Sequence, residues 1–206
     1  MKLRSRVGNV AKRVLDCSIA GSVLVLLSPL IAAEAAAIRL RLGSPVIFRQ
    51  RRPGLHGVPF EILKFRTMSS ELGPDGLLLP DAQRITRLGR LLRRTSLDEL
   101  PELVNVLRGD MSLVGPRPLL EAYLVRYTPE QARRHDVRPG VTGLAQVNGR
   151  NAMSWDDRLR LDTYYVDSHT MRLDLRIIVK TIRMVVTGHG VESDFGVPMP
   201  HFEGTS

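Results

Sequence analysis

The sequence has one cysteine, few aromatic residues and none of the widespread nucleotide- or metal-binding loops. Because Cys17 has no partner, disulfides and cysteine-based zinc sites are excluded within one chain, and a reducing, cytoplasm-facing location fits. Aromatic residues make up 5% of the chain, and no basic stretch is interleaved with them as in a base-stacking surface, so we expect no nucleic-acid partner. Walker A, GxGxxG, HExxH, GxSxG and EF-hand patterns are also absent, which excludes the hydrolases and oxidoreductases that depend on them.

The chain contains more basic than acidic residues. Thirty Lys and Arg residues against 21 Asp and Glu residues give the 206-residue chain a formal net charge of +9. Such a charge favours polyanions, which include nucleic acids, anionic lipid headgroups and phosphorylated substrates. The length suits a single domain with its own core and is short for two ordinary domains.

An uncharged apolar stretch runs from Cys17 to Ala33, slightly short of the ~20 residues that a bilayer span needs. A cleaved signal peptide, a membrane-spanning helix and a buried helix of a soluble domain are competing explanations. The positive-inside rule argues against a single crossing, because it places both ends of the stretch in the cytoplasm. The basic residues concerned are Lys2, Arg4, Arg6, Lys12 and Arg13 before the stretch, and Arg39, Arg41, Arg49, Arg51 and Arg52 after it.

Ser28 and Pro29 lie well inside this stretch, where a segment that enters and leaves by one face must turn. Proline removes a backbone donor and clashes with the preceding turn, while the Ser28 hydroxyl can satisfy the carbonyl that is freed. We therefore predict a re-entrant membrane helix over residues 1–40, broken at Ser28-Pro29. Residues 41–190 are expected to form a cytoplasmic domain with membrane-interface helices, and residues 191–206 an irregular tail.

The remaining patterns predict an α+β fold that is mostly helical and contains a small β-hairpin. Strands at 45–50 and 59–68 flank the turn-rich segment 51–57. A basic amphipathic helix over 84–94 can lie in the membrane interface or pack on a soluble core. The other expected elements are a helix from LDEL to a stop at Gly109 with Thr95 or Ser96 as its cap, a strand at 111–115, and helices at 118–127, 155–167 and 173–187.

Two neighbouring acidic residues, Asp98 and Glu99, stand at the expected start of a helix and follow Arg93 and Arg94. The positive end of the helix dipole and the adjacent cations keep a carboxylate ionised, as a phosphoryl-attacking nucleophile or a Mg²⁺ ligand must be. Acidic residues are also common in first turns simply as dipole partners. The pair alone therefore leaves both explanations open.

Arg117 stands between two prolines at the end of the segment GDMSLVGPRP. Restricted backbone freedom on both sides fixes where its guanidinium projects, and a guanidinium suits bidentate contact with phosphate oxygens. A plain structural turn explains the same pattern. The glycine-rich polar segment His135–Arg150 is typical of loops that carry binding groups.

Five motifs follow one another along the chain: the Ser28-Pro29 break, KFRTM at Lys64–Met68, SLDELPEL at Ser96–Leu103, GDMSLVGPRP at Gly109–Pro118 and RPGVTGLAQVNGR at Arg138–Arg150. In this order and spacing they resemble the bacterial sugar transferase family, the monotopic phosphoglycosyl transferases. The resemblance covers nearly the whole chain. Its short length is similar to the minimal PglC-type members.

The resemblance implies a transferase that moves a phosphosugar from a UDP-sugar to undecaprenyl phosphate and releases UMP. It implies a ping-pong route in which Asp98 attacks the β-phosphate and carries the phosphosugar covalently, with Glu99 assisting at Mg²⁺ or with the acceptor. Lys64, Arg93 and Arg117 match family positions that line the phosphate site. Asp98 and Glu99 are the expected Mg²⁺ ligands, and residues 41–190 the catalytic domain.

The same resemblance implies a place at the bacterial inner membrane, on its cytoplasmic face, in the first membrane step of glycan or glycoconjugate assembly such as protein glycosylation. The PglC-type likeness favours UDP-N,N′-diacetylbacillosamine or another UDP-amino sugar as donor. Membrane lipids and downstream glycosyltransferases are expected partners. A catalytically inactive, membrane-bound scaffold of the same fold and a nucleic-acid-binding protein are the alternatives.

Overall fold

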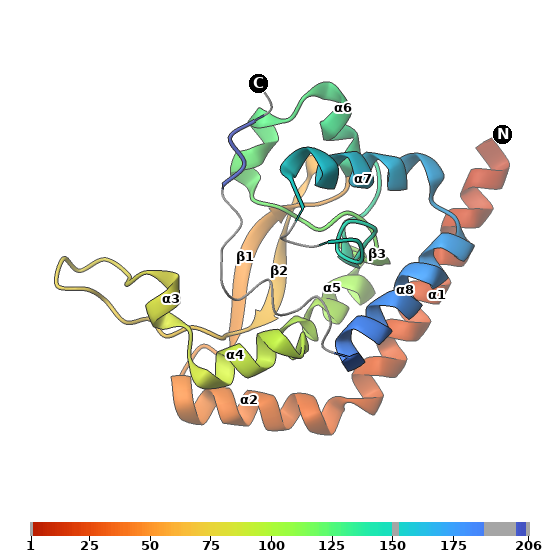
Figure 1. The fold of residues 1–206 in the computed structure, drawn as a ribbon. Helices are drawn as coiled ribbons and strands as arrows, with labels where there is room; N and C mark the ends of the chain where they lie inside the picture. The colour runs from red at the N-terminus through yellow and green to blue at the C-terminus, as the bar shows by residue number, and fades with distance from the viewer. Residues whose placement is uncertain (1, 150–152, 188–200, 205–206) are drawn as a thin grey trace.

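The computed structural model describes residues 2–149, 153–187 and 201–204, which form a helical framework around two small sheets (Figure 1). The predicted site motif ending at Arg150 and most of the predicted tail at 191–206 reach beyond the described residues. The helices are α1 (Lys2–Leu26), α2 (Ser28–Leu42), α3 (Asp81–Arg84), α4 (Arg87–Arg94), α5 (Glu102–Arg108), α6 (Pro129–Ala132), α7 (Trp155–Ser168) and α8 (Met171–Thr187). The strands are β1 (Ile47–Pro53), β2 (Pro59–Phe65), β3 (Ser112–Val114) and β4 (Gly140–Thr142), and the 3₁₀ turns are η1 (Leu55–Gly57), η2 (Leu97–Glu99), η3 (Glu121–Arg126) and η4 (Arg133–His135). The predicted α+β class is confirmed.

α1 and α2 meet at a bend of 64°, beside the predicted Ser28-Pro29 break. Pro29 has no N–H to offer the Val25 carbonyl, and the Ser28 hydroxyl donates to that carbonyl at 2.8 Å instead. Among the described residues, no single helix is long and apolar enough to cross a membrane, although this bent pair together meets that requirement. The sequence thus predicted both the break and the hydrogen bond that compensates for it.

The predicted hairpin is confirmed, with strands that are shifted along the chain. β1 and β2 pair antiparallel from Ile47 opposite Phe65 to Pro53 opposite Pro59. The first strand therefore extends into the segment that we expected to be a turn. η1 occupies the remainder of that segment.

A second, parallel pair of strands joins two of the sequence motifs. β3, which was predicted, pairs with β4, which was not, so that Ser112 lies beside Gly140. A Cβ atom added to Gly140 would lie 2.1 Å from the Gly115 nitrogen, so this close approach of two backbones requires glycine. The contact fixes the loop that follows β3 against the RPGVTG segment.

The predicted helix from LDEL begins later than expected, because the acidic pair lies in η2. The predicted cap is also wrong: the Thr95 hydroxyl donates to the Leu91 carbonyl at 2.9 Å and so ends α4. Ser96 adopts the left-handed backbone conformation, with φ at 55°, and its side chain caps no helix. The predicted stop at Gly109 is confirmed, with a left-handed φ of 95°.

Two more predicted helices differ from the structure, for separate reasons. The 84–94 pattern is divided where Thr86 accepts a hydrogen bond from the Gly89 amide at 2.9 Å and caps α4. Of the segment predicted as a helix at 118–127, only Glu121–Arg126 is helical, as the 3₁₀ helix η3. Its Tyr123 packs edge-on against Trp155 and Phe202, tertiary contacts that outweigh local helix propensity. The helices predicted at 155–167 and 173–187 are confirmed as α7 and α8.

Both helices of the bent pair are fixed to the rest of the chain. On α1, the buried Asp16 accepts a hydrogen bond at 2.7 Å from the hydroxyl of Ser112 on β3. On α2, the fully buried Ile38 packs in one apolar cluster with Phe65 of β2 and Leu92 of α4. The two helices therefore frame the domain along adjacent sides (Figure 1).

Candidate active site

Charged side chains from four segments meet beside η2. Lys64 on β2 donates from Nζ to Glu99 Oε1 at 2.7 Å and forms an ion pair with Glu102 Oε1 of α5 at 3.0 Å. Arg117, in the loop after β3, donates from Nη2 to the same Glu99 oxygen. Lys64, Glu99 and Arg117, all predicted as site residues, are therefore in direct contact.

The electrostatics of this cluster fix Glu99 as an anion. Burial opposes its charge, but the positive charges of Arg117 and Lys64 outweigh burial and hold the pKa of Glu99 below its usual range. Glu99 in turn raises the pKa of Arg117. Burial raises the pKa of Glu102 to about 7, so this second partner of Lys64 carries only part of a charge at neutral pH. Glu99 therefore stays ionised and holds Lys64 and Arg117 in position.

Asp98 differs sharply from its neighbour. Only 8% of its surface is exposed, yet its side chain makes no hydrogen bond or ion pair with any residue in the described part of the chain. Burial and repulsion from Glu99 raise its pKa, while Lys64, Arg93 and Arg117 act in the opposite direction. A carboxylate without fixed partners in a field of three cations is able to attack an electrophile or to bind a cation.

Arg93 approaches Asp98 from α4 and is held by the KFRTM motif. Its Nε donates to the Thr67 hydroxyl at 3.0 Å. α4 packs directly on this motif, since a Cβ atom added to Gly89 would lie 1.9 Å from the Thr67 carbonyl oxygen. The motif therefore places the charge of Arg93 beside the acidic pair, although its contact with phosphate stays a prediction.

The loop that carries Arg117 is fixed by a buried ion pair that the sequence did not reveal. Arg134 Nη2 donates to the Arg117 carbonyl at 2.8 Å and to Asp162 Oδ2 at 2.7 Å. The Arg134 and Asp162 side chains are 1% and 2% exposed. They come from η4 and α7, so no local pattern connects them, and only tertiary structure brings them to the loop.

Arg52, near the end of β1, is a further cation that we did not predict as a site residue. Its Nε is buried and has no hydrogen-bond partner among the described residues. Burial and repulsion from Arg117 lower the pKa of Arg52. The guanidinium groups of Arg52 and Arg117 repel each other, and a phosphate bound by both of them would offset this repulsion. The flanking sequence PVIFRQRRPG gave no means of choosing it among its neighbouring arginines.

Glu34 on α2 is a second unpredicted residue. It is 6% exposed, and both of its carboxylate oxygens are without a hydrogen-bond partner in the described structure. The charge of Asp98 acts on it directly. Its position as an isolated charge in an otherwise apolar segment was the signal that could have identified it.

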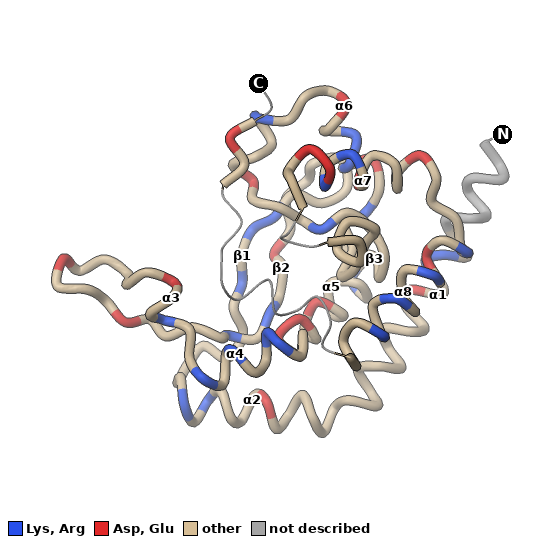
Figure 2. The backbone as a smooth tube through the Cα atoms, viewed as in Figure 1, with Lys and Arg blue, Asp and Glu red and all other residues tan. Residues whose placement is uncertain are grey.

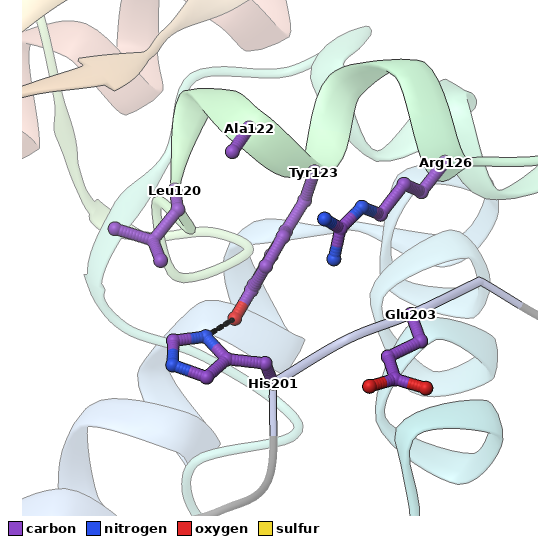
Figure 3. A pocket seen from close by; sticks show the side chains of 6 residues that line it. All are labelled: Leu120, Ala122, Tyr123, Arg126, His201 and Glu203. Atoms are coloured by element: carbon purple, nitrogen blue, oxygen red, sulfur yellow. Dashed lines mark hydrogen bonds between the residues drawn. The ribbon is translucent and has the colours of Figure 1, made fainter.

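A separate pocket of about 600 Å³ lies between η3 and the C-terminal residues 201–204 (Figure 3). The Tyr123 hydroxyl and His201 Nδ1 are 3.1 Å apart across it, and the adjacent Phe202 is 1% exposed. Its lining contains none of the predicted site residues; it consists of Leu120, Ala122, Tyr123, Arg126, His201 and Glu203. These contacts fasten residues 201–204 to η3.

Magnesium was predicted at Asp98 and Glu99. The described residues contain no group of three or more His, Cys, Asp or Glu side chains that is able to hold a metal ion. Mg²⁺ commonly takes one or two carboxylates and completes its shell with water and substrate phosphates, so the donor set fits this ion. Asp98 is unengaged, whereas Glu99 Oε1 is already shared by Lys64 and Arg117. Asp98 is therefore the better placed of the two predicted ligands, and the metal itself stays a prediction.

Comparison with known proteins gives a family and several relatives. The family described as bacterial sugar transferase matches residues 7–188. An uncharacterized sugar transferase of Bacillus subtilis, EpsL, is 51% identical over 196 residues, which are 95% of this chain and 97% of that protein. The UDP-glucose:undecaprenyl-phosphate glucose-1-phosphate transferase of Caulobacter vibrioides is 45% identical over 192 residues, with 87% of this chain and 71% of that protein covered. The UDP-N-acetylgalactosamine-undecaprenyl-phosphate N-acetylgalactosaminephosphotransferase of Aeromonas hydrophila is 40% identical over 187 residues, with 87% of this chain and 44% of that protein covered.

Proposed function

The chain belongs to the bacterial sugar transferase family, and from that premise we propose that this transferase moves a phosphosugar from a UDP-sugar to undecaprenyl phosphate and releases UMP. The names of the Caulobacter and Aeromonas relatives describe reactions of this class. The observation that carries the proposal is the Asp98 carboxylate, which is buried without partners beside the cations that Glu99 holds.

In the first half-reaction, a carboxylate oxygen of Asp98 attacks the β-phosphorus of the UDP-sugar. The bond from this phosphorus to the bridging oxygen breaks, UMP leaves with the electron pair, and the phosphosugar remains on Asp98 as an acyl phosphate. Lys64 and Arg117 neutralise the phosphate charges from positions that Glu99 fixes. Because burial raises the pKa of Asp98, its ionised form is a stronger nucleophile than an exposed carboxylate.

In the second half-reaction, a phosphate oxygen of the lipid acceptor attacks the same phosphorus, and the bond to Asp98 breaks. The carboxylate is regenerated, and the sugar leaves on a lipid diphosphate. Glu99 contributes by holding the two cations, because its low pKa makes it unsuitable as a proton donor. Bound Mg²⁺ would supply further charge neutralisation on the phosphate oxygens.

Exposed apolar side chains support a place at the membrane. Leu40 on α2, Leu91 on α4 and Val186 on α8 are 86%, 55% and 79% exposed. An aqueous surface with such residues on three helices is unfavourable, whereas a lipid surface buries them. We propose that the bent pair α1 and α2 re-enters the cytoplasmic face of the inner membrane and holds the site at the headgroup plane, where a lipid-anchored acceptor and a water-soluble donor meet.

The donor is tested by a screen of UDP-sugars for UMP release, with the detergent-solubilised chain, undecaprenyl phosphate and Mg²⁺. The candidates are UDP-glucose, UDP-N-acetylgalactosamine, UDP-N-acetylglucosamine and UDP-N,N′-diacetylbacillosamine, of which the last is the donor that the sequence analysis predicted. We expect acceptor-dependent UMP release with one preferred donor. Absence of turnover with every donor would instead support an inactive scaffold.

The re-entrant topology predicts that both ends of the bent pair face the cytoplasm. In a Cys17→Ser background, Val10→Cys and Arg41→Cys place a thiol at exposed positions on either side of the apolar segment. We expect an impermeant maleimide to label neither thiol in intact spheroplasts and both in lysed ones. Labelling of either position in intact spheroplasts would contradict this topology.

A further inference from the structure

Glu34 is a buried acidic side chain for which the described chain supplies no partner. Only 6% of the residue is exposed, and neither carboxylate oxygen has a hydrogen-bond donor or acceptor within reach in the described structure. An unpaired carboxylate in apolar surroundings is destabilised, and buried carboxylates are normally hydrogen-bonded or bound to a cation. Glu34 therefore has the environment of a ligand whose partner comes from outside the chain.

The packing of α2 turns Glu34 towards the catalytic turn. Ile31 and Ile38 lie three residues before and four residues after it, and so share its face of the helix. Both belong to an apolar cluster that also contains Leu97, the residue before Asp98. Glu34 is the single acidic position on α2, visible as one red segment in Figure 2. The repulsion between Glu34 and Asp98 agrees with this orientation.

Four carboxylates thus lie near the site, and Lys64 already forms ion pairs with two of them, Glu99 and Glu102. Lys64 and Arg117 both donate to Glu99, which leaves that group occupied. Glu34 lies on the face of α2 that packs near Leu97, the residue before Asp98, and the structure gives neither Glu34 nor Asp98 a hydrogen bond or ion pair to a described residue. A cation bound between these two buried, unpaired carboxyl groups would satisfy both of them and would hold both in the ionised form. Their oxygen donors and their number suit Mg²⁺.

We propose that Asp98 and Glu34 are the two protein carboxylates that hold Mg²⁺, and that Glu34 takes the place predicted for Glu99. One ligand then comes from the catalytic turn and the other from the bent helix pair. The metal would thereby tie α2 to η2. The inference rests on the proposed function only for the phosphate oxygens that complete the metal shell.

Binding of Mn²⁺ alone, measured by the loss of its free electron paramagnetic resonance signal, tests this site on the detergent-solubilised full chain. Glu34→Gln keeps the size of the side chain and removes its charge, and we expect the Kd for Mn²⁺ to rise at least tenfold. Glu71→Gln, in an exposed loop, is the matched control and should bind as the wild type does. Unchanged affinity in Glu34→Gln, together with lost affinity in Glu99→Gln, would overturn the proposal.

Glu34→Leu provides a second readout that a purely structural role would not produce. Without metal, this variant should unfold at a higher temperature than the wild type, because it removes an unpaired buried carboxyl group. Mn²⁺ should raise the unfolding temperature of the wild type and leave that of Glu34→Leu unchanged. An equal rise in both proteins would contradict the site.

Different results would contradict the proposed function and the metal site. If the wild type releases no UMP with any donor while Glu34→Gln still weakens Mn²⁺ binding, the proposed function fails and the metal site stands. If the wild type turns over and Glu34→Gln binds Mn²⁺ normally, the metal site fails and the function stands.

Discussion

Replacement of Asp98 by Asn is expected to abolish UMP release, with a loss on the order of 10³-fold or more. The amide has nearly the same shape as the carboxylate but is a poor nucleophile, so the acyl phosphate would not form. The measurement is a single-turnover assay of UMP release with the preferred donor. Asp75→Asn, in the exposed loop before α3, is the matched control and should turn over normally.

The same variant should also be more stable than the wild type at neutral pH. Burial raises the pKa of Asp98 above its unfolded value of 3.8, so the ionised carboxylate destabilises the fold at pH values above both pKa values. This penalty decreases as the pH falls through the folded pKa and is gone below 3.8. The difference in unfolding temperature between Asp98→Asn and the wild type should therefore be positive at pH 7.5 and shrink towards pH 4.

These two results together separate a catalytic group from a structural one. A residue that only supports the fold loses stability and activity together when it is replaced. Retained turnover in Asp98→Asn would contradict the covalent mechanism. A fall in stability with loss of activity would indicate that Asp98 acts through the fold.

Local chemistry is what the sequence could predict about the fold. Pro29 and Ser28 specify a helix break because one lacks an amide donor and the other supplies a hydroxyl, and both effects act within one turn. The glycine at 109 specifies a stop by its left-handed φ. By contrast, β4 is three residues long and pairs only because Gly115 and Gly140 approach closely, a contact that depends on the folded chain. The same limit explains η3, where aromatic packing decides the backbone.

The same distinction between local chemistry and tertiary contacts applies to the residues of the candidate site. Lys64, Glu99 and Arg117 were predicted from motifs and are in contact, although the sequence could not show that Glu99 is occupied by the other two. Glu34 comes from a helix far from Asp98 in sequence, and only packing of α2 on α4 and Leu97 brings its helix face near the turn that carries Asp98. Predictions from motifs therefore identified the charged residues of the site, but not which of them pair with one another and which stay unpaired.

Replacement of Asp162 by Ala is expected to reduce the free energy of unfolding by roughly 3–5 kcal/mol, because it leaves Arg134 charged and unpaired in the interior. Asp167→Ala is a closely matched control, since Asp167 lies on the same helix α7 and pairs with the neighbouring Arg133. That pair is 37% and 55% exposed and is screened by solvent, so its loss should cost far less than loss of the buried pair. Denaturant unfolding of both variants measures the difference, and equal costs would show that burial does not determine the strength of the Arg134 pair.

A double replacement, Arg134→Met with Asp162→Leu, separates stability from positioning at the same place. Two apolar side chains of similar volume should recover most of the free energy of unfolding, because no buried charge is left without a partner. The Arg117 carbonyl nevertheless loses the donor that holds it at 2.8 Å. We therefore expect a well-folded protein with a reduced kcat and a higher KM for the donor, since Arg117 no longer has a fixed place beside Glu99. Wild-type kinetics in the stable double variant would show that the two prolines alone fix this loop.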